Sequence, residues 1–108
     1  MNNVSKARLE RLDRLNDLLY KIGTKSEVTP SDYRKLRELR VFIEPAVNDP
    51  AVGELAKQYI EAVDVLLKAI NLLADNKSAE AEALAEKFAA LCSMLTETIQ
   101  NFKRGGDE

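Results

Sequence analysis

The sequence predicts an all-α fold, a four-helix bundle-like single domain in which a short hairpin of two helices packs on a long hairpin of two more. Two observations support this prediction. Apolar residues recur with the 3.6-residue period of an α-helix along four segments, and no segment shows the two-residue alternation of a strand. Proline and glycine lie near the ends of these segments, Gly53 excepted, as expected for helices joined by short turns.

The chain has 108 residues, enough for one domain with its own core and too few for two. We expect residues 1–4 to fray, residues 5–104 to form the helical domain, and residues 105–108 to be a disordered tail. The first helix is expected to run from Ser5, as its cap, to about Ile22. Gly23 follows as a left-handed stop, because glycine adopts that conformation without steric cost.

The second helix has the clearest start signal. In the stretch Val28-Thr29-Pro30-Ser31-Asp32, Thr29 suits the N-cap, Pro30 suits the first helical position, and Asp32 completes a capping box. Pro45 ends this helix or kinks it. Its predicted apolar face consists of Tyr33, Leu36, Leu39, Phe42 and Ile43.

The third helix is predicted from Asp49, as N-cap, to Asp75, and it has an unusually wide apolar face. So wide a face needs at least two neighbours to cover it. The fourth helix is predicted from Ser78 to about Lys103, and its alanine-rich first half allows a close neighbour. Together these helices predict a core of Leu36, Leu39, Leu55, Tyr59, Ile60, Val63, Leu66, Leu67, Ile70, Phe88, Leu91 and Leu95.

The composition argues against catalysis. The chain has no histidine, which removes histidine-based catalysis and the common zinc sites, and its four glycines form no phosphate-binding loop. Carboxylates at Glu80, Glu82 and Glu86, and at Glu61 and Asp64, are explained by ordinary helix surfaces. The single cysteine, Cys92, lies among apolar residues and is expected to be buried. We therefore expect no enzyme activity, no cofactor and no metal.

Charge is distributed unevenly along the chain. Residues 1–44 carry a net charge of +3 and residues 45–108 a net charge of −5, giving −2 overall. Acidic residues interleave with the arginines and can pair with them locally: Glu10, Asp13, Asp17 and Glu38. Six of the seven arginines fall in the first part at three-residue spacing, and they form the candidate partner-binding set: Arg8, Arg11, Arg14, Arg34, Arg37 and Arg40.

These features favour a small protein-binding module, such as a regulator, an inhibitor or an assembly factor, whose partner is another protein. Two alternatives remain open: a nucleic-acid-associated protein that uses the arginines, and a small-ligand sensor with a pocket between helices near Tyr20, Tyr33 or Tyr59. The two long helices extend past the two short ones, so we expect a homodimer through the start of the fourth helix or the far end of the third. The sequence shows no signal peptide and no membrane-spanning run, which predicts a soluble, cytoplasmic protein.

Overall fold

The computed structural model describes residues 6–25 and 27–105. This part of the chain contains α1 (Lys6–Gly23), α2 (Pro30–Ile43), a short 3-10 helix η1 (Glu44–Asn48), α3 (Gly53–Ala74) and α4 (Ser78–Gly105), and no strand. The predicted all-α, four-helix fold is therefore confirmed. The predicted frayed start, the cap at Ser5 and the last three residues of the predicted tail lie outside the described residues.

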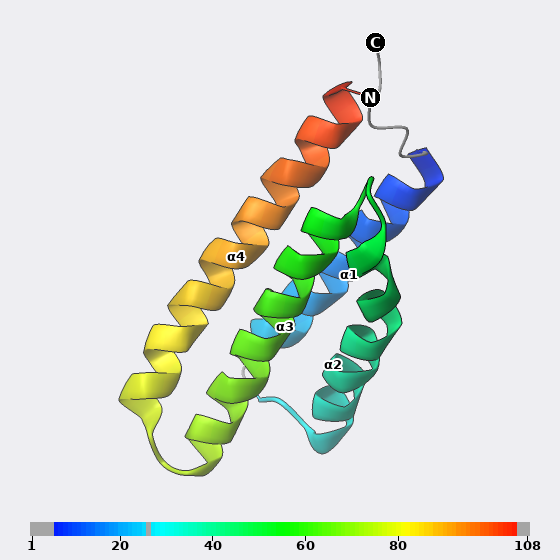
Figure 1. The fold of residues 1–108 in the computed structure, drawn as a ribbon. Helices are drawn as coiled ribbons and strands as arrows, with labels where there is room; N and C mark the ends of the chain where they lie inside the picture. Colours follow the sequence, from blue (N-terminus) through cyan, green and yellow to red (C-terminus); the bar gives the residue numbers. More distant parts are fainter. Residues whose placement is uncertain (1–5, 26, 106–108) are drawn as a thin grey trace.

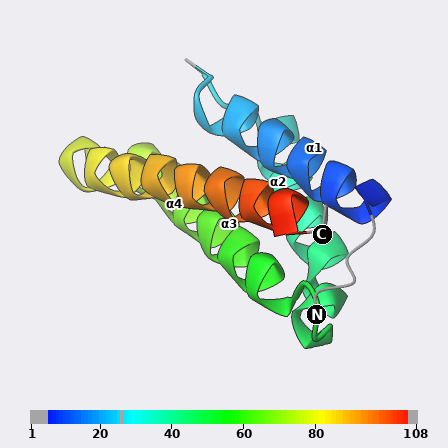
Figure 2. The ribbon, with the colours of Figure 1, turned by 90° about the horizontal axis from the view of Figure 1, so that it is seen from above.

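The helices run alternately up and down. In Figure 1, α3 lies between α4 on one side and α2 on the other, and Figure 2 shows α1 lying alongside α4. Asn16 on α1 bonds Thr96 on α4, while Asp13 bonds Lys103, so these two helices are antiparallel. Each short helix packs mainly on one helix of the long hairpin, α1 on α4 and α2 on α3. The two short helices contact each other less.

The core lies where α3 faces the other helices. Tyr59 is fully buried there, and its hydroxyl donates a 3.1 Å hydrogen bond to the carbonyl oxygen of Leu15 on α1. Nine of the twelve predicted core residues are buried. The remaining three are only partly buried and line the edge of the core: Ile60, Leu67 and Ile70.

The start of α2 is confirmed in detail. The hydroxyl of Thr29 accepts a 3.1 Å hydrogen bond from the backbone N–H of Asp32, and the carboxylate of Asp32 accepts a 3.0 Å bond from the N–H of Thr29. Each side chain thus satisfies a backbone donor that the first helical turn leaves without a partner. Pro45 ends the α-helix as predicted, and the chain continues as η1.

The predicted start of α3 was wrong by three residues. The Asp49 carboxylate accepts from the N–H of Ala51 at 2.7 Å, but it caps only a turn, and the helix begins at Gly53. A Cβ added to Gly53 would lie 2.6 Å from the carbonyl oxygen of Val47, so the η1 backbone presses against this position. Glycine at Gly53 is therefore required by a close backbone approach.

The end of α1 also differs from the sequence-based expectation. Gly23 has no left-handed conformation; it is the last residue of α1 and packs against the ring of Phe88. The left-handed stop occurs instead after α3, at Asn76, whose φ is 62°. The N–H of Lys77 then bonds the carbonyl oxygen of Leu72 at 2.9 Å, which closes a Schellman motif and turns the chain into α4.

Candidate functional site

The six candidate arginines do not form one face. Arg40 points to α3, where its Nε donates a 2.7 Å hydrogen bond to Asp64 and its Nη1 lies 3.2 Å from Glu44. The bond to Asp64 raises the pKa of Arg40 above its ordinary value. Arg40 therefore links α2 to α3. We no longer count it among the arginines that are available to a partner.

Arg8 also has a structural partner. Its Nη2 lies 2.8 Å from the carboxylate of Asp49, which links the start of α1 to the turn before α3. Arg8 pairs with Asp49, and Arg40 pairs with Glu44 and Asp64; these three acids are not among the interleaved ones. Asp13, one of those interleaved acids, pairs with Lys103 on α4 instead, at 3.1 Å.

The outer side of α2 carries two exposed apolar side chains. Val41 is 67% exposed and Phe42 is 61% exposed, although Phe42 was placed on the predicted apolar face of this helix. That prediction was wrong because the side of α2 that packs on α3 is formed by Leu36, Leu39 and Ile43. Phe42 lies at the edge of that stripe, where no helix covers it fully.

Two hollows meet at Phe42. The larger, about 670 Å³, runs along the outer face of α2. The smaller, about 120 Å³, lies between the start of α1 and the end of α2, and the buried side chains of Leu12, Ile43 and Val52 help to line it. The larger hollow is lined by Pro30, Tyr33, Arg34, Arg37, Glu38, Val41 and Phe42, and the smaller by Arg8, Arg11, Leu12, Leu15, Phe42, Ile43, Ala46 and Val52.

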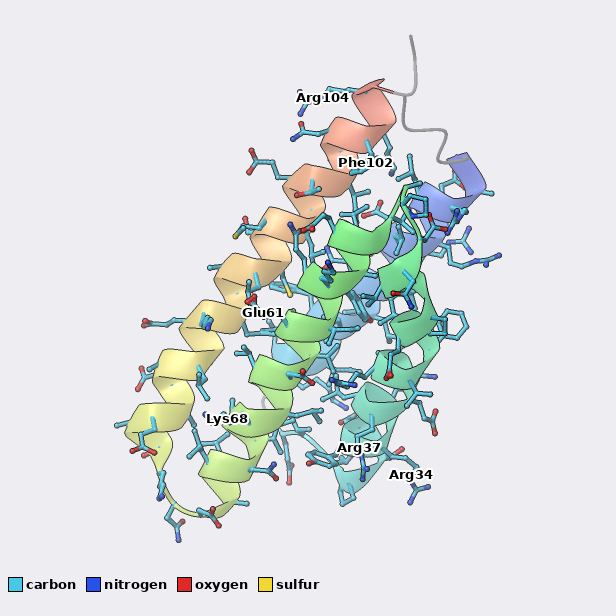
Figure 3. The ribbon with its side chains drawn as sticks, in the orientation of Figure 1. Arg34, Arg37, Glu61, Lys68, Phe102 and Arg104 are labelled. Atoms are coloured by element: carbon cyan, nitrogen blue, oxygen red, sulfur yellow. The ribbon has the colours of Figure 1, made fainter. Side chains whose placement is uncertain are left out.

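Four of the six candidate arginines border these two hollows. Figure 3 shows Arg34 and Arg37 pointing outward from α2. Within residues 6–25 and 27–105, Arg11, Arg34 and Arg37 make no ion pair. We name the Phe42 surface as Arg8, Arg11, Arg34, Arg37, Val41 and Phe42; Arg14 is exposed on α1 but lines neither hollow.

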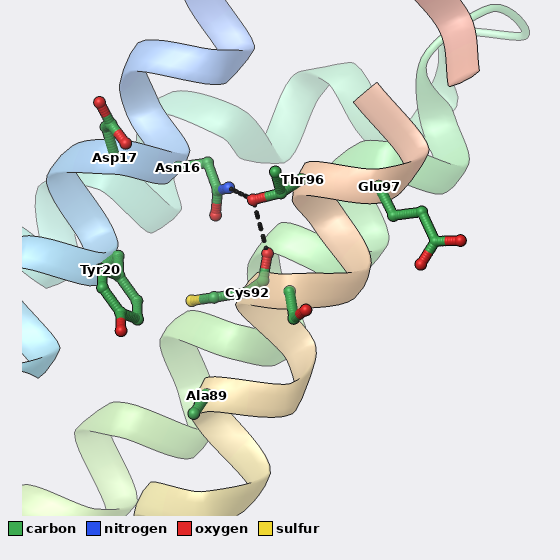
Figure 4. Close-up of a pocket in the computed structure, with 8 residues that line it drawn as sticks. Asn16, Asp17, Tyr20, Ala89, Cys92, Thr96 and Glu97 are labelled. Carbon is green, nitrogen blue, oxygen red and sulfur yellow. Dashed lines mark hydrogen bonds between the residues drawn. The ribbon is translucent and has the colours of Figure 1, made fainter. Parts of the chain in front are cut away.

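A separate hollow, of about 470 Å³, lies between α1 and α4. Figure 4 shows Asn16 reaching across to Thr96, to whose hydroxyl its Nδ2 donates at 2.8 Å, while that hydroxyl donates to the carbonyl oxygen of Cys92 at 3.0 Å. Asn16 is 5% exposed, and its Oδ1 has no hydrogen-bond partner in the described part of the chain. Tyr20 is 48% exposed and lines the same hollow.

The other two tyrosines have different surroundings. Tyr59 is committed to the core, and burial raises the pKa of its hydroxyl far above the usual value. Tyr33 lines the larger hollow of the Phe42 surface, and its hydroxyl accepts a 3.3 Å hydrogen bond from Asn71. Of the three tyrosines considered as ligand contacts, only Tyr20 therefore lies at the α1–α4 hollow.

Another hollow, of about 620 Å³, lies near the tip of the α3–α4 hairpin. Its lining is mostly apolar and includes Ile70 and the 57%-exposed Leu73 from α3 and Ala81 and Ala85 from α4. Lys25 and Val28, from the connection between α1 and α2, border it on one side. The hollow therefore lies at the start of the fourth helix and the far end of the third, where the sequence predicted a contact between two copies of the chain.

Among the described residues no group of three or more carboxylates, cysteines or histidines is close enough to hold a metal ion. Asp64, one of the carboxylates considered above, is paired with Arg40. Cys92 is buried as predicted, and burial raises the pKa of its thiol to about 11, so little reactive thiolate forms near neutral pH.

Comparisons with known proteins supply no relative: no protein-family model, no curated protein and no solved structure matches the chain significantly. No helix within residues 6–25 and 27–105 has the length and apolar character needed to cross a bilayer.

Proposed function

We propose that the chain is a non-enzymatic protein-binding module and that the Phe42 surface is where its partner binds. One observation carries the proposal: two large apolar side chains, Val41 and Phe42, are exposed side by side and four arginines surround them. Such a module acts as a regulator, an inhibitor or an assembly factor, by occupying a surface of another protein.

The composition of the Phe42 surface supports a protein partner. Aromatic residues and arginine are enriched at protein interfaces and dominate binding energy where they sit together, whereas isolated exposed apolar residues need no such explanation. A nucleic acid is the lesser candidate, because Arg8 is already paired with Asp49 and Glu38 adds a negative charge to the larger hollow. The chain as a whole is also negative.

Photo-crosslinking tests this proposal directly. Benzoylphenylalanine placed at position 42, in cells that express the protein, is expected to give a discrete protein adduct that the added changes Arg34→Glu and Arg37→Glu abolish. The matched control carries the crosslinker at Met94, which is 52% exposed on α4, away from the Phe42 surface. Identical adducts from both positions, or none from position 42, would overturn the proposal.

The nucleic-acid alternative has its own test. Fluorescence anisotropy with labelled duplex and single strands is expected to show little binding at about 0.15 M salt, where screening acts over about 8 Å. Tight binding at that salt concentration, falling steeply with added salt and lost in the Arg34→Glu/Arg37→Glu variant, would favour the nucleic-acid function because each neutralised phosphate releases counterions.

We also propose that the protein forms a homodimer through the hollow at the tip of the α3–α4 hairpin. The support is the mostly apolar lining, with Leu73 exposed at its edge and small alanines opposite. Light scattering at high micromolar concentration is expected to give the mass of a dimer, and Leu73→Glu is expected to give a monomer with unchanged helicity. A wild-type monomer at that concentration excludes the dimer.

A ligand-binding function is the second candidate, and the unpartnered oxygen of Asn16 beside the α1–α4 hollow favours it. A fragment screen by NMR would show shifts at Asn16, Tyr20 and Thr96 if the hollow accepts a small molecule. For the site of action we propose the cytoplasm, a reducing compartment that suits a single unpaired cysteine.

A further inference from the structure

We infer that the partner segment bound by the Phe42 surface is an acidic amphipathic helix, lying along α2, with one aliphatic side chain inserted into the smaller hollow. This inference rests on the proposed function and specifies the chemistry of its partner. Three properties of the surface lead to it: its charge, the shape of its larger hollow, and the apolar lining of its smaller one.

The charge of the surface selects an anionic partner. Four guanidinium groups border the two hollows, of which that of Arg8 is paired with Asp49, and only one carboxylate, that of Glu38, is among the lining residues. Arg11, Arg34 and Arg37 make no ion pair with any described residue, so they are available to carboxylates of a partner. Arginine binds carboxylates with two parallel hydrogen bonds, which gives direction as well as attraction.

The shape of the larger hollow selects a helix. Its lining residues run along the outer face of α2 from Pro30 to Phe42, a length of about 18 Å. A partner helix of about twelve residues spans the same distance. An extended peptide is disfavoured, because no sheet edge exists in the described chain to pair with its backbone, whereas a helix satisfies its own backbone hydrogen bonds.

The smaller hollow selects an apolar anchor. Its volume is about 120 Å³, and its lining combines the buried side chains of Leu12, Ile43 and Val52 with Arg8 and Arg11. An engineered apolar cavity of about 150 Å³ accepts benzene, so this space suits one leucine, isoleucine or methionine side chain. A phosphate or a sugar is polar and would not pack against that apolar lining. The smaller hollow therefore favours an aliphatic side chain over a nucleic acid.

A display library provides an unbiased probe. Random peptides of about 16 residues, about 24 Å long as helices, are selected on the intact protein and sorted against the Phe42→Ser variant. We expect enriched sequences with net negative charge and large aliphatic residues at spacings of three, four and seven. Enrichment of neutral or basic peptides, or no enrichment over the variant, would overturn the inference.

Binding measurements on the enriched peptides then test each contact. Glutamate-to-glutamine peptides, and the Arg34→Glu/Arg37→Glu variant, should each bind about tenfold more weakly or worse, and lysine in place of the peptide glutamates should restore binding to that variant. The matched control Arg104→Glu, at the far end of α4, should leave affinity unchanged. Equal affinity for acidic and glutamine peptides would exclude the charge argument.

The two proposals fail differently. If the protein crosslinked from position 42 contacts that position through a segment that is neither acidic nor helical, the protein-binding function stands and the present inference fails. If single-stranded oligonucleotides bind the Phe42 surface more tightly than any selected peptide, both fail and the nucleic-acid function replaces them.

Discussion

Gly23 at the end of α1 lies directly against the ring of Phe88 on α4, leaving no room for a side chain. A Cβ added to Gly23 would overlap this ring, coming within 2.6 Å of Cζ, and Phe88 is only 2% exposed. Alanine is favoured over glycine in a helix by about 1 kcal/mol, but overpacking a core costs about 1–3 kcal/mol. Gly23→Ala should therefore destabilise the fold by up to about 2 kcal/mol in urea denaturation.

A double-mutant cycle separates this contact from a general effect of the substitution. Phe88→Leu alone should destabilise, because it leaves space in the core. Combined with Phe88→Leu, the change Gly23→Ala should cost less than it does alone, or become stabilising, because the shorter side chain leaves room for the added methyl group. Strict additivity of the two changes would contradict the proposed contact.

The role of Gly23 also marks a boundary of what the sequence could predict. Helix order, the capping box at Thr29 and most of the core follow from local patterns, since each depends on residues a few positions apart. The contact between Gly23 and Phe88 joins residues on different helices, so no local pattern reports it. A glycine after an apolar stripe predicted a left-handed stop, but the tertiary contact determines that position.

The candidate site was predicted only in part, for the same reason. The arginine spacing correctly indicated exposed positive charge on the first two helices, yet it could not show that Arg40 turns to Asp64 or that Arg8 turns to Asp49. The exposure of Phe42 was missed because periodicity gives the apolar side of a helix without showing how much of it neighbours cover. A partial signal was present: Val41 adjoins Phe42 and does not belong to the predicted apolar face.

Adjacent leucines on α3 provide a test of the core boundary. Leu66 is 5% exposed and belongs to the core, whereas Leu67 is only partly buried and packs on the core's edge. Leu66→Ala should cost about 2–5 kcal/mol of unfolding free energy, and Leu67→Ala at least about 1 kcal/mol less than that. Denaturant melts of both variants check this, and equal losses would mean that Leu67 is as fully packed as Leu66.

Asn16 and Thr96 share a hydrogen bond, but replacing one or the other should have different effects on the free energy of unfolding. Asn16→Leu removes a hydrogen bond but also removes the unpartnered Oδ1, and the Thr96 hydroxyl keeps its bond to Cys92. This change should be neutral or stabilising, whereas Thr96→Val leaves the whole Asn16 amide without a partner and should cost about 1–3 kcal/mol. Thermal unfolding compares the two, and a strongly destabilised Asn16→Leu variant would show that the amide oxygen is satisfied in solution.

Two capping carboxylates should make stability depend on acidic pH. The pKa of Asp32 is lowered mainly by the ammonium of Lys25, which donates a 2.6 Å hydrogen bond to it, and next by the N–H of Thr29. The pKa of Asp49 is lowered mainly by the guanidinium of Arg8 and next by the N–H of Ala51. Both pKa values are lower in the folded state than the ordinary 3.8. The unfolded chain therefore binds more protons at low pH, so this stabilisation is present above about pH 5 and is lost as pH falls through the folded-state pKa values.

Chemical denaturation at pH values between about 2 and 7 measures the effect. Asp32→Asn and Asp49→Asn should each flatten the acidic part of the stability profile, because the substituted side chain no longer titrates. Lys25→Met and Arg8→Met should flatten it in the same direction by removing the largest cause of each shift while leaving the carboxylate in place. Profiles parallel to the wild type in all four variants would mean that neither carboxylate is stabilised in the folded state, and the loss of stability in acid would then come from other groups.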